Sequence, residues 1–182
     1  FIKTNRPRLQ VVPLVNNYSQ ALQNWDNANL EATLDSPSGR ATLVGALLGW
    51  VRGNGFAGIN IDFENLSPGS RAGLDAFMSE LHARFHPLGL TVAESVPMSD
   101  PAFDYRSLSR HADYLVLMAY DEHASTSDPG QVASQKWFTD SVHARLADIP
   151  ADKMVVGLGS YGYDWAEGQP AAIPITFDQA IA

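Results

Sequence analysis

Two kinds of hydrophobic pattern alternate along this chain. Short, continuous apolar runs are typical of buried strands, and they predict strands at residues 9–15, 58–63, 90–96, 114–118 and 154–158. Between them, apolar side chains recur every three or four positions, which predicts helices at residues 38–52, 70–85 and 134–146 and a helical turn at 105–109. Residues 16–25 are polar and are predicted to form a loop, and the tail from residue 166 has no clear pattern.

Strands that alternate with helices indicate an α/β fold with parallel strands and helical crossovers. Largely apolar strands fit a sheet that is covered on both faces. Two architectures satisfy this pattern: an open doubly wound sheet and a TIM (β/α)8 barrel. A complete eight-stranded barrel usually takes about 250 residues. This chain has 182, so a barrel built from it would be incomplete.

Composition narrows the set of partners. The chain is 45% hydrophobic and 18% charged, with a net charge of -8. A negative surface repels phosphate backbones and anionic lipids, so we expect no nucleic-acid partner and no membrane contact by this segment. A neutral or cationic polymer meets no such barrier. The sequence contains no cysteine, which excludes disulfides and thiolate metal sites.

The strand at residues 58–64 carries the most informative polar residues. It reads Gly-Ile-Asn-Ile-Asp-Phe-Glu, so Asn60, Asp62 and Glu64 point to the face opposite the apolar side chains. In a barrel this polar face lies toward the axis, at the strand end where barrels carry their chemistry. The alternative is an amphipathic strand with one solvated face, which parallel sheets disfavour.

Asp62 and Glu64 lie roughly 6.5 to 7 Å apart along that face. Like charges this close in a site of low dielectric constant raise the pKa of at least one carboxyl group. A carboxylic acid that stays protonated near neutral pH is what glycoside cleavage requires of its general acid. The pair is therefore a candidate for acid catalysis on a sugar.

Residues 57–64 resemble the signature of glycoside hydrolase family 18, the chitinase-like family, whose fourth strand reads Asp-Gly-x-Asp-x-Asp-x-Glu. Glu64 falls on the proton donor of that family and Asp62 on the preceding aspartate. The sequence departs from the signature at Ala57 and at Asn60. The branch that includes spore-cortex-lytic enzymes also tends to have Asn at the Asn60 position.

Two further motifs resemble the same family. Residues 118–121, Met-Ala-Tyr-Asp, are similar to Met-x-Tyr-Asp at the end of strand six. Residues 157–162, Gly-Leu-Gly-Ser-Tyr-Gly, are similar to Gly-x-x-x-Tyr-Gly of strand seven. In that register strands three to seven are visible, and the resemblance covers about residues 9–165. Residues 113–165 look closest to the hydrolase-like domains fused to polysaccharide deacetylase and glycosyltransferase modules, which implies possible fusion to other catalytic modules.

The resemblance implies a substrate-assisted mechanism that needs no metal and no organic cofactor. Such enzymes cleave β-1,4 bonds beside an N-acetylated sugar, whose acetamido group is the nucleophile. Glu64 would protonate the leaving oxygen, and Asp62 would hold the acetamido N–H and stabilise the oxazolinium-like intermediate. Tyr120 would hydrogen-bond the acetamido oxygen and Asp121 would help to bind the sugar. Asn60 can hydrogen-bond Asp62, but it adds no negative charge.

Several other residues are candidates for contact with the sugar. Tyr161 is a site-wall residue by resemblance, with simple packing as the alternative. Asn16, Asn17 and Tyr18 follow the first predicted strand, where ordinary loop polarity is the alternative. His123 follows the Tyr-Asp motif near the barrel mouth. Trp165 could stack on a sugar ring or pack in the core.

Three polar residues fall on other predicted elements. His82 and His86 are four positions apart on one helix, a spacing that can bind a metal. Because no acidic residue accompanies them in the needed pattern, we expect a solvated helix face and no metal site. Glu94 lies among apolar residues of a strand, and the sequence does not identify a partner for it.

The sequence thus predicts a glycoside hydrolase acting on β-linked N-acetylhexosamine polymers: chitin, peptidoglycan or exopolysaccharide. Hydrolysis and transglycosylation both fit. One alternative is a non-catalytic glycan-binding domain within a larger polysaccharide-processing protein, and another is an open-sheet module for a small molecule. We expect residues 1–182 to form one partial barrel domain, with residues 166–182 beginning an insertion before the last strand. The resemblance suggests an extracytoplasmic or cell-envelope location.

Overall fold

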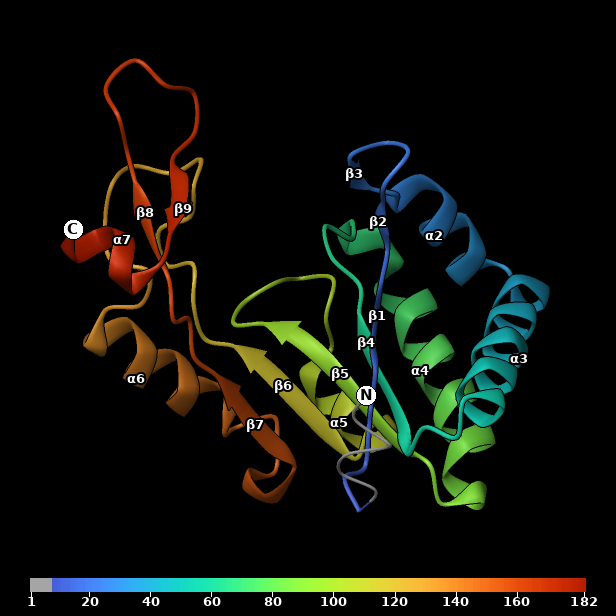
Figure 1. Cartoon of the computed structure of the whole chain (residues 1–182). Coiled ribbons are helices and arrows are strands. Elements are labelled where there is room, and N and C mark those ends of the chain that lie inside the picture. The colour runs from blue at the N-terminus through green and yellow to red at the C-terminus, as the bar shows by residue number, and fades with distance from the viewer. Residues whose placement is uncertain (1–7) are drawn as a thin grey trace.

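A computed structural model describes residues 8–182, so the first seven residues of the predicted domain lie outside the described residues. Its main feature is a five-stranded parallel sheet (Figure 1). In spatial order the strands are β1 (Leu14–Asn16), β4 (Gly58–Asp62), β5 (Thr91–Pro97), β6 (Tyr114–Met118) and β7 (Met154–Gly157). This order follows the chain without reversal. A doubly wound sheet reverses its strand order, so the arrangement is an arc of a barrel.

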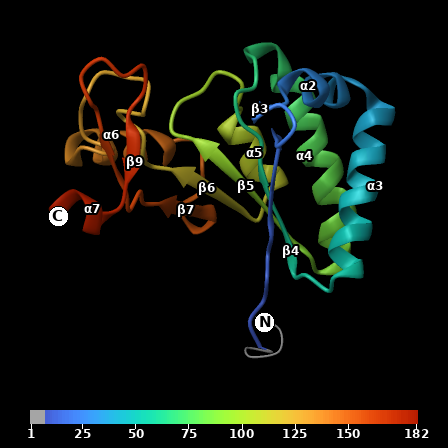
Figure 2. The same ribbon diagram turned by 45° about the horizontal axis from the view of Figure 1, so that its top comes forward.

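Helices cover the sheet from one side. The crossovers contain α2 (Asn27–Asp35), α3 (Pro37–Gly53), α4 (Arg71–Phe85), α5 (Tyr105–His111) and α6 (Gln135–Arg145), with short 3-10 turns η1 (Pro68–Ser70), η2 (His86–Leu88) and η3 (Ala151–Lys153). Figures 1 and 2 show α2, α3 and α4 side by side next to β1 and β4. No helix among residues 8–182 combines the length and the apolar character needed to cross a bilayer.

The core lies between the sheet and these helices. Ile59 and Ile61 of β4 are completely buried against it, and the ring of Phe63 lies 5.5 Å from that of Phe77 on α4. The apolar half of the β4 alternation therefore faces the helices, as predicted. The polar half must face the other way, toward the barrel axis.

The N-terminal part differs from the prediction of a strand at 9–15 and a loop at 16–25. Pro13 has no N–H to donate. The described residues before β1 accept hydrogen bonds from the neighbouring segment, from Ala57 N to Val11 O and from Asn60 N to Pro13 O (both 2.9 Å). Strand geometry therefore begins at Leu14. The predicted loop contains a small antiparallel pair, β2 (Tyr18–Ser19) and β3 (Asn24–Trp25).

Four further elements lay outside the predictions. Helix α2 buries only Leu30 and Leu34, too short an apolar repeat to be recognised. In the unpatterned tail, β9 (Ile173–Ile175) pairs antiparallel with β8 (Gly162–Asp164), which precedes the tail, and α7 (Phe177–Ile181) follows. The N–H of Ala172 donates to the carbonyl of Ser125, which ties this pair to the loop after β6. That residues 166–182 begin an insertion stays a prediction.

Glu94 of β5 lies on the helix-facing side of the sheet, beside Ile61 of β4. Its side chain is 1% exposed, and neither carboxylate oxygen has a hydrogen-bond partner among the described residues. Burial, and then the charge of Asp75 on α4, raise the pKa of Glu94 well above its ordinary value. Burial therefore favours the protonated form of Glu94, and this residue is not part of the polar face of the barrel.

Replacing Glu94 with Gln is expected to raise the free energy of unfolding at pH 8 and to weaken its pH dependence. In the wild type the unfolded chain loses this proton at the ordinary pKa, while the folded chain keeps it to higher pH. Stability therefore falls as pH rises between the two pKa values, by up to about 1.4 kcal/mol per pH unit. Urea unfolding at pH 5 and pH 8 measures the effect. An equal difference between the two pH values in both proteins would disprove it.

Candidate active site

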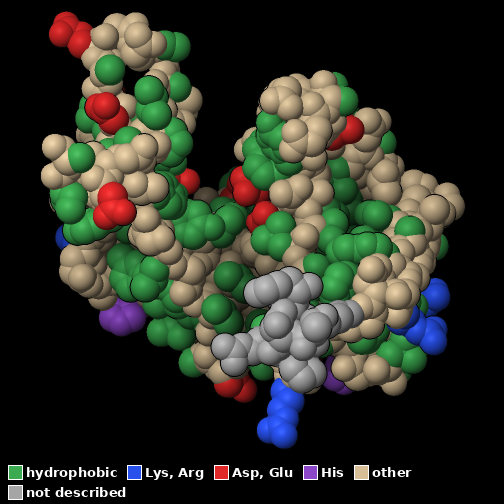
Figure 3. All heavy atoms as spheres, in the orientation of Figure 1, with side chains coloured by type: hydrophobic (Ala, Val, Ile, Leu, Met, Phe, Trp, Pro, Cys, Tyr) green, Lys and Arg blue, Asp and Glu red, His purple; other side chains and the backbone are tan. Residues whose placement is uncertain are grey.

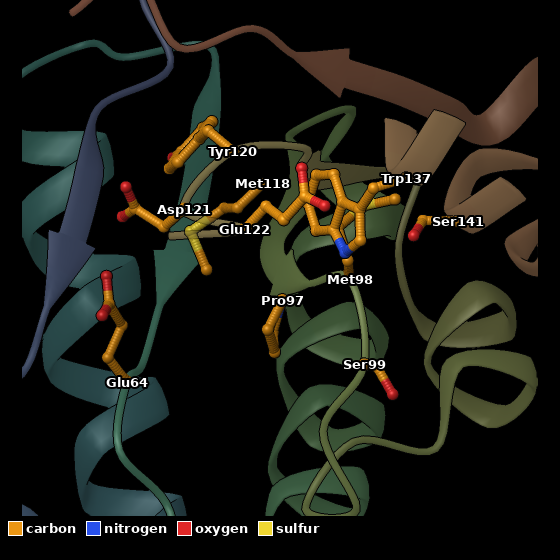
Figure 4. A pocket seen from close by; sticks show the side chains of 10 residues that line it. All are labelled: Glu64, Pro97, Met98, Ser99, Met118, Tyr120, Asp121, Glu122, Trp137 and Ser141. Carbon is orange, nitrogen blue, oxygen red and sulfur yellow. The ribbon is translucent and has the colours of Figure 1, made fainter. Parts of the chain in front are cut away.

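A pocket of about 380 Å³ opens at the C-terminal ends of β4, β5 and β6. The side chains that line it are those of Glu64, Pro97, Met98, Ser99, Met118, Tyr120, Asp121, Glu122, Trp137 and Ser141 (Figure 4). Figure 3 shows acidic side chains gathered in the hollow between the two raised parts of the molecule. The structure thus brings together Glu64, Tyr120 and Asp121, which come from two of the sequence motifs.

Glu64 is half-buried two residues after the end of β4, and Asp62 is 9% exposed at the end of that strand. Burial raises the pKa of Glu64, and the charges of Asp62 and Asp121 raise it further. Burial also raises the pKa of Asp62, against the effect of a hydrogen bond from Ser95. The pocket therefore favours a protonated Glu64 beside other carboxyl groups, which is the state that a general acid needs.

Asn60 connects to Asp62 through a third residue. Its amide nitrogen donates to Ser95 Oγ (3.0 Å), and Ser95 in turn hydrogen-bonds Asp62. The amide oxygen of Asn60 is buried and has no partner among residues 8–182. Ser95 was not identified from the sequence. The alternation of β5 could have identified it. Ala93 and Ser95, the neighbours of the helix-facing Glu94, are small residues that face the barrel axis.

Tyr120 lies among the acidic groups. Burial raises its pKa first, and then the charges of Asp62, Glu64 and Asp121 add to the shift. Its hydroxyl therefore stays protonated and can donate a hydrogen bond. Asp121 has a left-handed backbone with φ of 62°, an uncommon conformation for a non-glycine residue. This turn sends the chain out of the sheet immediately after Tyr120.

A row of aromatic rings extends from Tyr120 into the strand-seven motif and β8. Ring centroids are 6.1 Å apart for Tyr120 and Tyr161, 5.6 Å for Tyr161 and Tyr163, and 5.5 Å for Tyr163 and Trp165. The hydroxyls of Tyr161 (2.5 Å) and Tyr163 (3.1 Å) both donate to Asp121 Oδ1. Tyr161 thus holds Asp121. Tyr163 was missed, although the spacing Tyr-Gly-Tyr-Asp-Trp indicates aromatic side chains on one face.

The opposite wall of the pocket comes from α6. Trp137 and Ser141 lie on this helix, across the pocket from Glu64 and Asp121 (Figure 4). Glu122 holds the start of the helix, because its carboxylate accepts from Ser134 N (2.6 Å) and from Ser134 Oγ (3.0 Å). The sequence did not identify this wall as part of the site.

Asn16 and His123 lie outside the pocket lining. Asn16 is exposed at the end of β1, and its side-chain oxygen accepts from Tyr18 N (3.2 Å). His123 lies in the loop after β6, where its Nδ1 is 2.9 Å from the carbonyl oxygen of Asp128 and its ring fills the space beside Gly130. Contact of either residue with a sugar stays a prediction.

Asn17 holds the main chain of Glu64. Its Oδ1 accepts from Glu64 N (2.9 Å), and its Nδ2 donates to Glu64 O (3.1 Å) and to Asn27 Oδ1 (3.0 Å). Asn27 in turn donates to the carbonyl of Asn65 (2.7 Å), whose φ is 55°. The amide of Asn17 therefore binds both the backbone N–H and the C=O of Glu64. The residue that directly follows β1 thus fixes the main chain from which the Glu64 carboxyl group projects.

The chain is similar to proteins that process carbohydrates. The sequence model described as "Glycosyl hydrolases family 18" matches residues 6–180. The cortical fragment-lytic enzyme of Bacillus subtilis is 30% identical over 152 residues, which covers 76% of this chain and 35% of that protein. The uncharacterized glycosylase YvbX of B. subtilis is 26% identical over 169 residues, or 88% of this chain and 49% of that protein. The chain thus spans about half or less of the length of these relatives.

A solved structure supports the same grouping. The chitinase of Chromobacterium violaceum superposes with a TM-score of 0.89 at 29% identity, over 99% of this chain and 59% of that chain. Such neighbours are TIM barrels, and the five parallel strands described above are part of that fold. The fold class predicted from the sequence is confirmed.

Proposed function

The chain belongs to glycoside hydrolase family 18, and on that premise we propose that it cleaves β-linked N-acetylhexosamine polymers with the help of the substrate's own acetamido group. Membership of the family supports glycosidase activity in general. The observation that carries the finer proposal is the pocket at the sheet end, where Glu64, Tyr120 and Asp121 converge beside Asp62 and the pKa of Glu64 is raised.

In the proposed reaction Glu64 gives its proton to the glycosidic oxygen as the bond to the anomeric carbon breaks. The acetamido oxygen attacks that carbon from the opposite face and forms a cyclic oxazolinium-like intermediate. Asp62 accepts a hydrogen bond from the acetamido N–H, and the hydroxyl of Tyr120 donates to the acetamido oxygen. Glu64, now a carboxylate, takes a proton from the water that opens the ring. Two inversions at one carbon retain its configuration.

The test is cleavage of β-1,4-linked N-acetylglucosamine oligosaccharides by the full-length protein, with β-1,4-linked glucose oligosaccharides of equal length as the control. We expect cleavage of the acetylated series alone, with the first product in the β configuration by NMR. Equal cleavage of both series, or an inverted product, would exclude the acetamido-assisted mechanism. Binding of the acetylated series without cleavage would favour the alternative, a non-catalytic glycan-binding domain.

The identity of the natural polymer is a further part of the proposal. The names of relatives point to two polymers, since they include chitinases and cortical fragment-lytic enzymes. Chitin, peptidoglycan and exopolysaccharides with N-acetylated sugars all supply the required acetamido group. Fusion to other catalytic modules and a location outside the cytoplasm stay predictions.

Replacing Asn17 with Ala is expected to lower kcat about tenfold to a hundredfold with little change in KM. The substitution removes both hydrogen bonds to the backbone of Glu64, and a misplacement of about 1 Å can cost on the order of 10²-fold in rate. Steady-state kinetics on the acetylated oligosaccharide measure the effect. Asn24→Ala in the neighbouring β2–β3 hairpin is the control, because the side chain of Asn24 accepts from the N–H of Trp25, away from Glu64. Equal kcat in both variants would show that the hydrogen bonds from Asn17 to the main chain of Glu64 have no catalytic consequence.

A further inference from the structure

Two histidines and an aspartate meet at the end of the sheet opposite the pocket. His82 lies on the last turn of α4, His86 begins η2, and Asp113 directly precedes β6. Their ligand atoms all lie within 4.8 Å of one another, and no other group of this kind occurs among residues 8–182. The sequence predicted a solvated helix face here because no acidic residue accompanies the two histidines in the pattern that a metal site needs. Asp113 lies far along the chain from them, directly before β6.

The backbone holds both imidazoles on one face. The N–H of His86 donates to the carbonyl of His82, so the helical path continues through both residues. Their rings stack with centroids 4.7 Å apart and an interplanar angle of 20°. Histidines at i and i+4 on one helical face are a recurring arrangement for binding zinc.

The carboxylate of Asp113 is held ready to act as a ligand. Its Oδ2 accepts from Val92 N (2.8 Å), and its own N–H donates to Val92 O (2.7 Å). The other oxygen, Oδ1, lies 3.8 Å from His86 Nδ1. A second hydrogen-bond partner that orients a ligating carboxylate is typical of metal sites.

Basic groups outside the cluster also act on His82. Burial, and then His86, lower the pKa of His82, and the charge of Asp113 opposes this shift. His111 and Lys153 also lower the pKa of His82. The ammonium group of Lys153 is bound by the carbonyl oxygens of Ser109 (2.8 Å) and Ala112 (2.9 Å).

We propose that His82, His86 and Asp113 bind a divalent transition-metal ion of the zinc class. Two imidazoles and one carboxylate suit Zn²⁺, Co²⁺ or Ni²⁺ rather than Mg²⁺ or Ca²⁺, which prefer oxygen ligands. Tetrahedral zinc would bring the three ligand atoms to about 3.3 Å apart. The side chain of His86 is 64% exposed, so it has room to turn toward the other two ligands. Water would take the fourth position.

The position of this site gives it a structural role. It links the connection between α4 and β5 to the start of β6, whereas Tyr120 follows the other end of β6. Five strand residues at about 3.3 Å each separate the two ends by on the order of 16 Å. A bound ion would therefore stabilise the end of the sheet opposite the pocket without contacting the sugar. This proposal does not depend on the proposed function.

The test is titration of the chelator-treated, full-length protein with Zn²⁺ by calorimetry and with Co²⁺ by visible absorption. We expect one ion per cluster and an increase in Tm with Zn²⁺. His86→Ala and Asp113→Asn should each weaken binding by at least about tenfold, since even partners behind the ligands contribute roughly 10- to 100-fold. His143→Ala is the matched control, because His143 is exposed on α6 and should leave binding unchanged.

Two outcomes would overturn the proposal. One is that neither metal binds the wild type. The other is that His86→Ala and Asp113→Asn bind as tightly as the wild type, which would place the ion elsewhere. Circular dichroism of each variant establishes that it is folded, and His86→Ala is expected to be so because the side chain is largely exposed.

Discussion

Glu64→Gln is expected to lower kcat on N-acetylglucosamine oligosaccharides by roughly 10²- to 10⁴-fold, the usual contribution of a positioned general acid. Gln keeps the size of the side chain but cannot donate the proton. The substrate still meets Asp62 and Tyr120, so KM should change little. Steady-state kinetics on the acetylated oligosaccharide and on an analogue with a good leaving group separate the loss of proton donation from any loss of substrate binding. The analogue needs less protonation and should be cleaved at a rate closer to that of the wild type.

The matched control is Glu94→Gln, the same chemical change on the neighbouring strand but on the helix-facing side of the sheet. This variant should retain wild-type kcat and KM. If Glu64→Gln kept full activity, Glu64 would not be the acid. If both variants lost activity equally, the loss would come from disturbance of the sheet and not from proton transfer.

The local pattern of the sequence was enough to predict the frame of the site. The alternation along residues 58–64 correctly separated the core-facing isoleucines from Asp62 and Glu64, because a strand places alternate side chains on opposite faces. The motifs around Tyr120 and Tyr161 were placed at strand ends by their resemblance to family 18 motifs, and they follow β6 and β7. Strand positions and the direction of side chains are local properties, which periodicity reports.

Contacts between distant segments could not be read in this way. Asn17 grips the main chain of Glu64 from 47 positions earlier, and nothing in its own neighbourhood distinguishes it from loop polarity. Asp113 joins His82 and His86 only after α4, β5 and α5 have folded between them. The opposite wall of the pocket, with Trp137, was missed because its helix shows only an amphipathic pattern. Each of these residues can be found in the sequence, but only the folded structure shows which of them lie in contact.

Asp62→Asn is expected to lower kcat/KM by about 10²- to 10³-fold, the range found when one electrostatic stabiliser of a transition state is removed. In the proposed mechanism Asp62 offers its negative charge to the positive oxazolinium-like intermediate, and an amide cannot do so. The substitution is nearly isosteric and Asp62 is only 9% exposed. Circular dichroism and Tm should therefore confirm a folded variant before the kinetics are compared.

The same variant should also shift the pH profile. Glu64 acts in its protonated form, so its loss of a proton sets the basic limb of the kcat/KM profile. The charge of Asp62 raises the pKa of Glu64 more than that of Asp121 does, after burial. Removing the Asp62 charge lowers this pKa, so the basic limb should move to lower pH in Asp62→Asn, and by less in Asp121→Asn. If the basic limb stays in place in Asp62→Asn, or moves further in Asp121→Asn, the charge of Asp62 is not the main charge that raises the pKa of the catalytic acid.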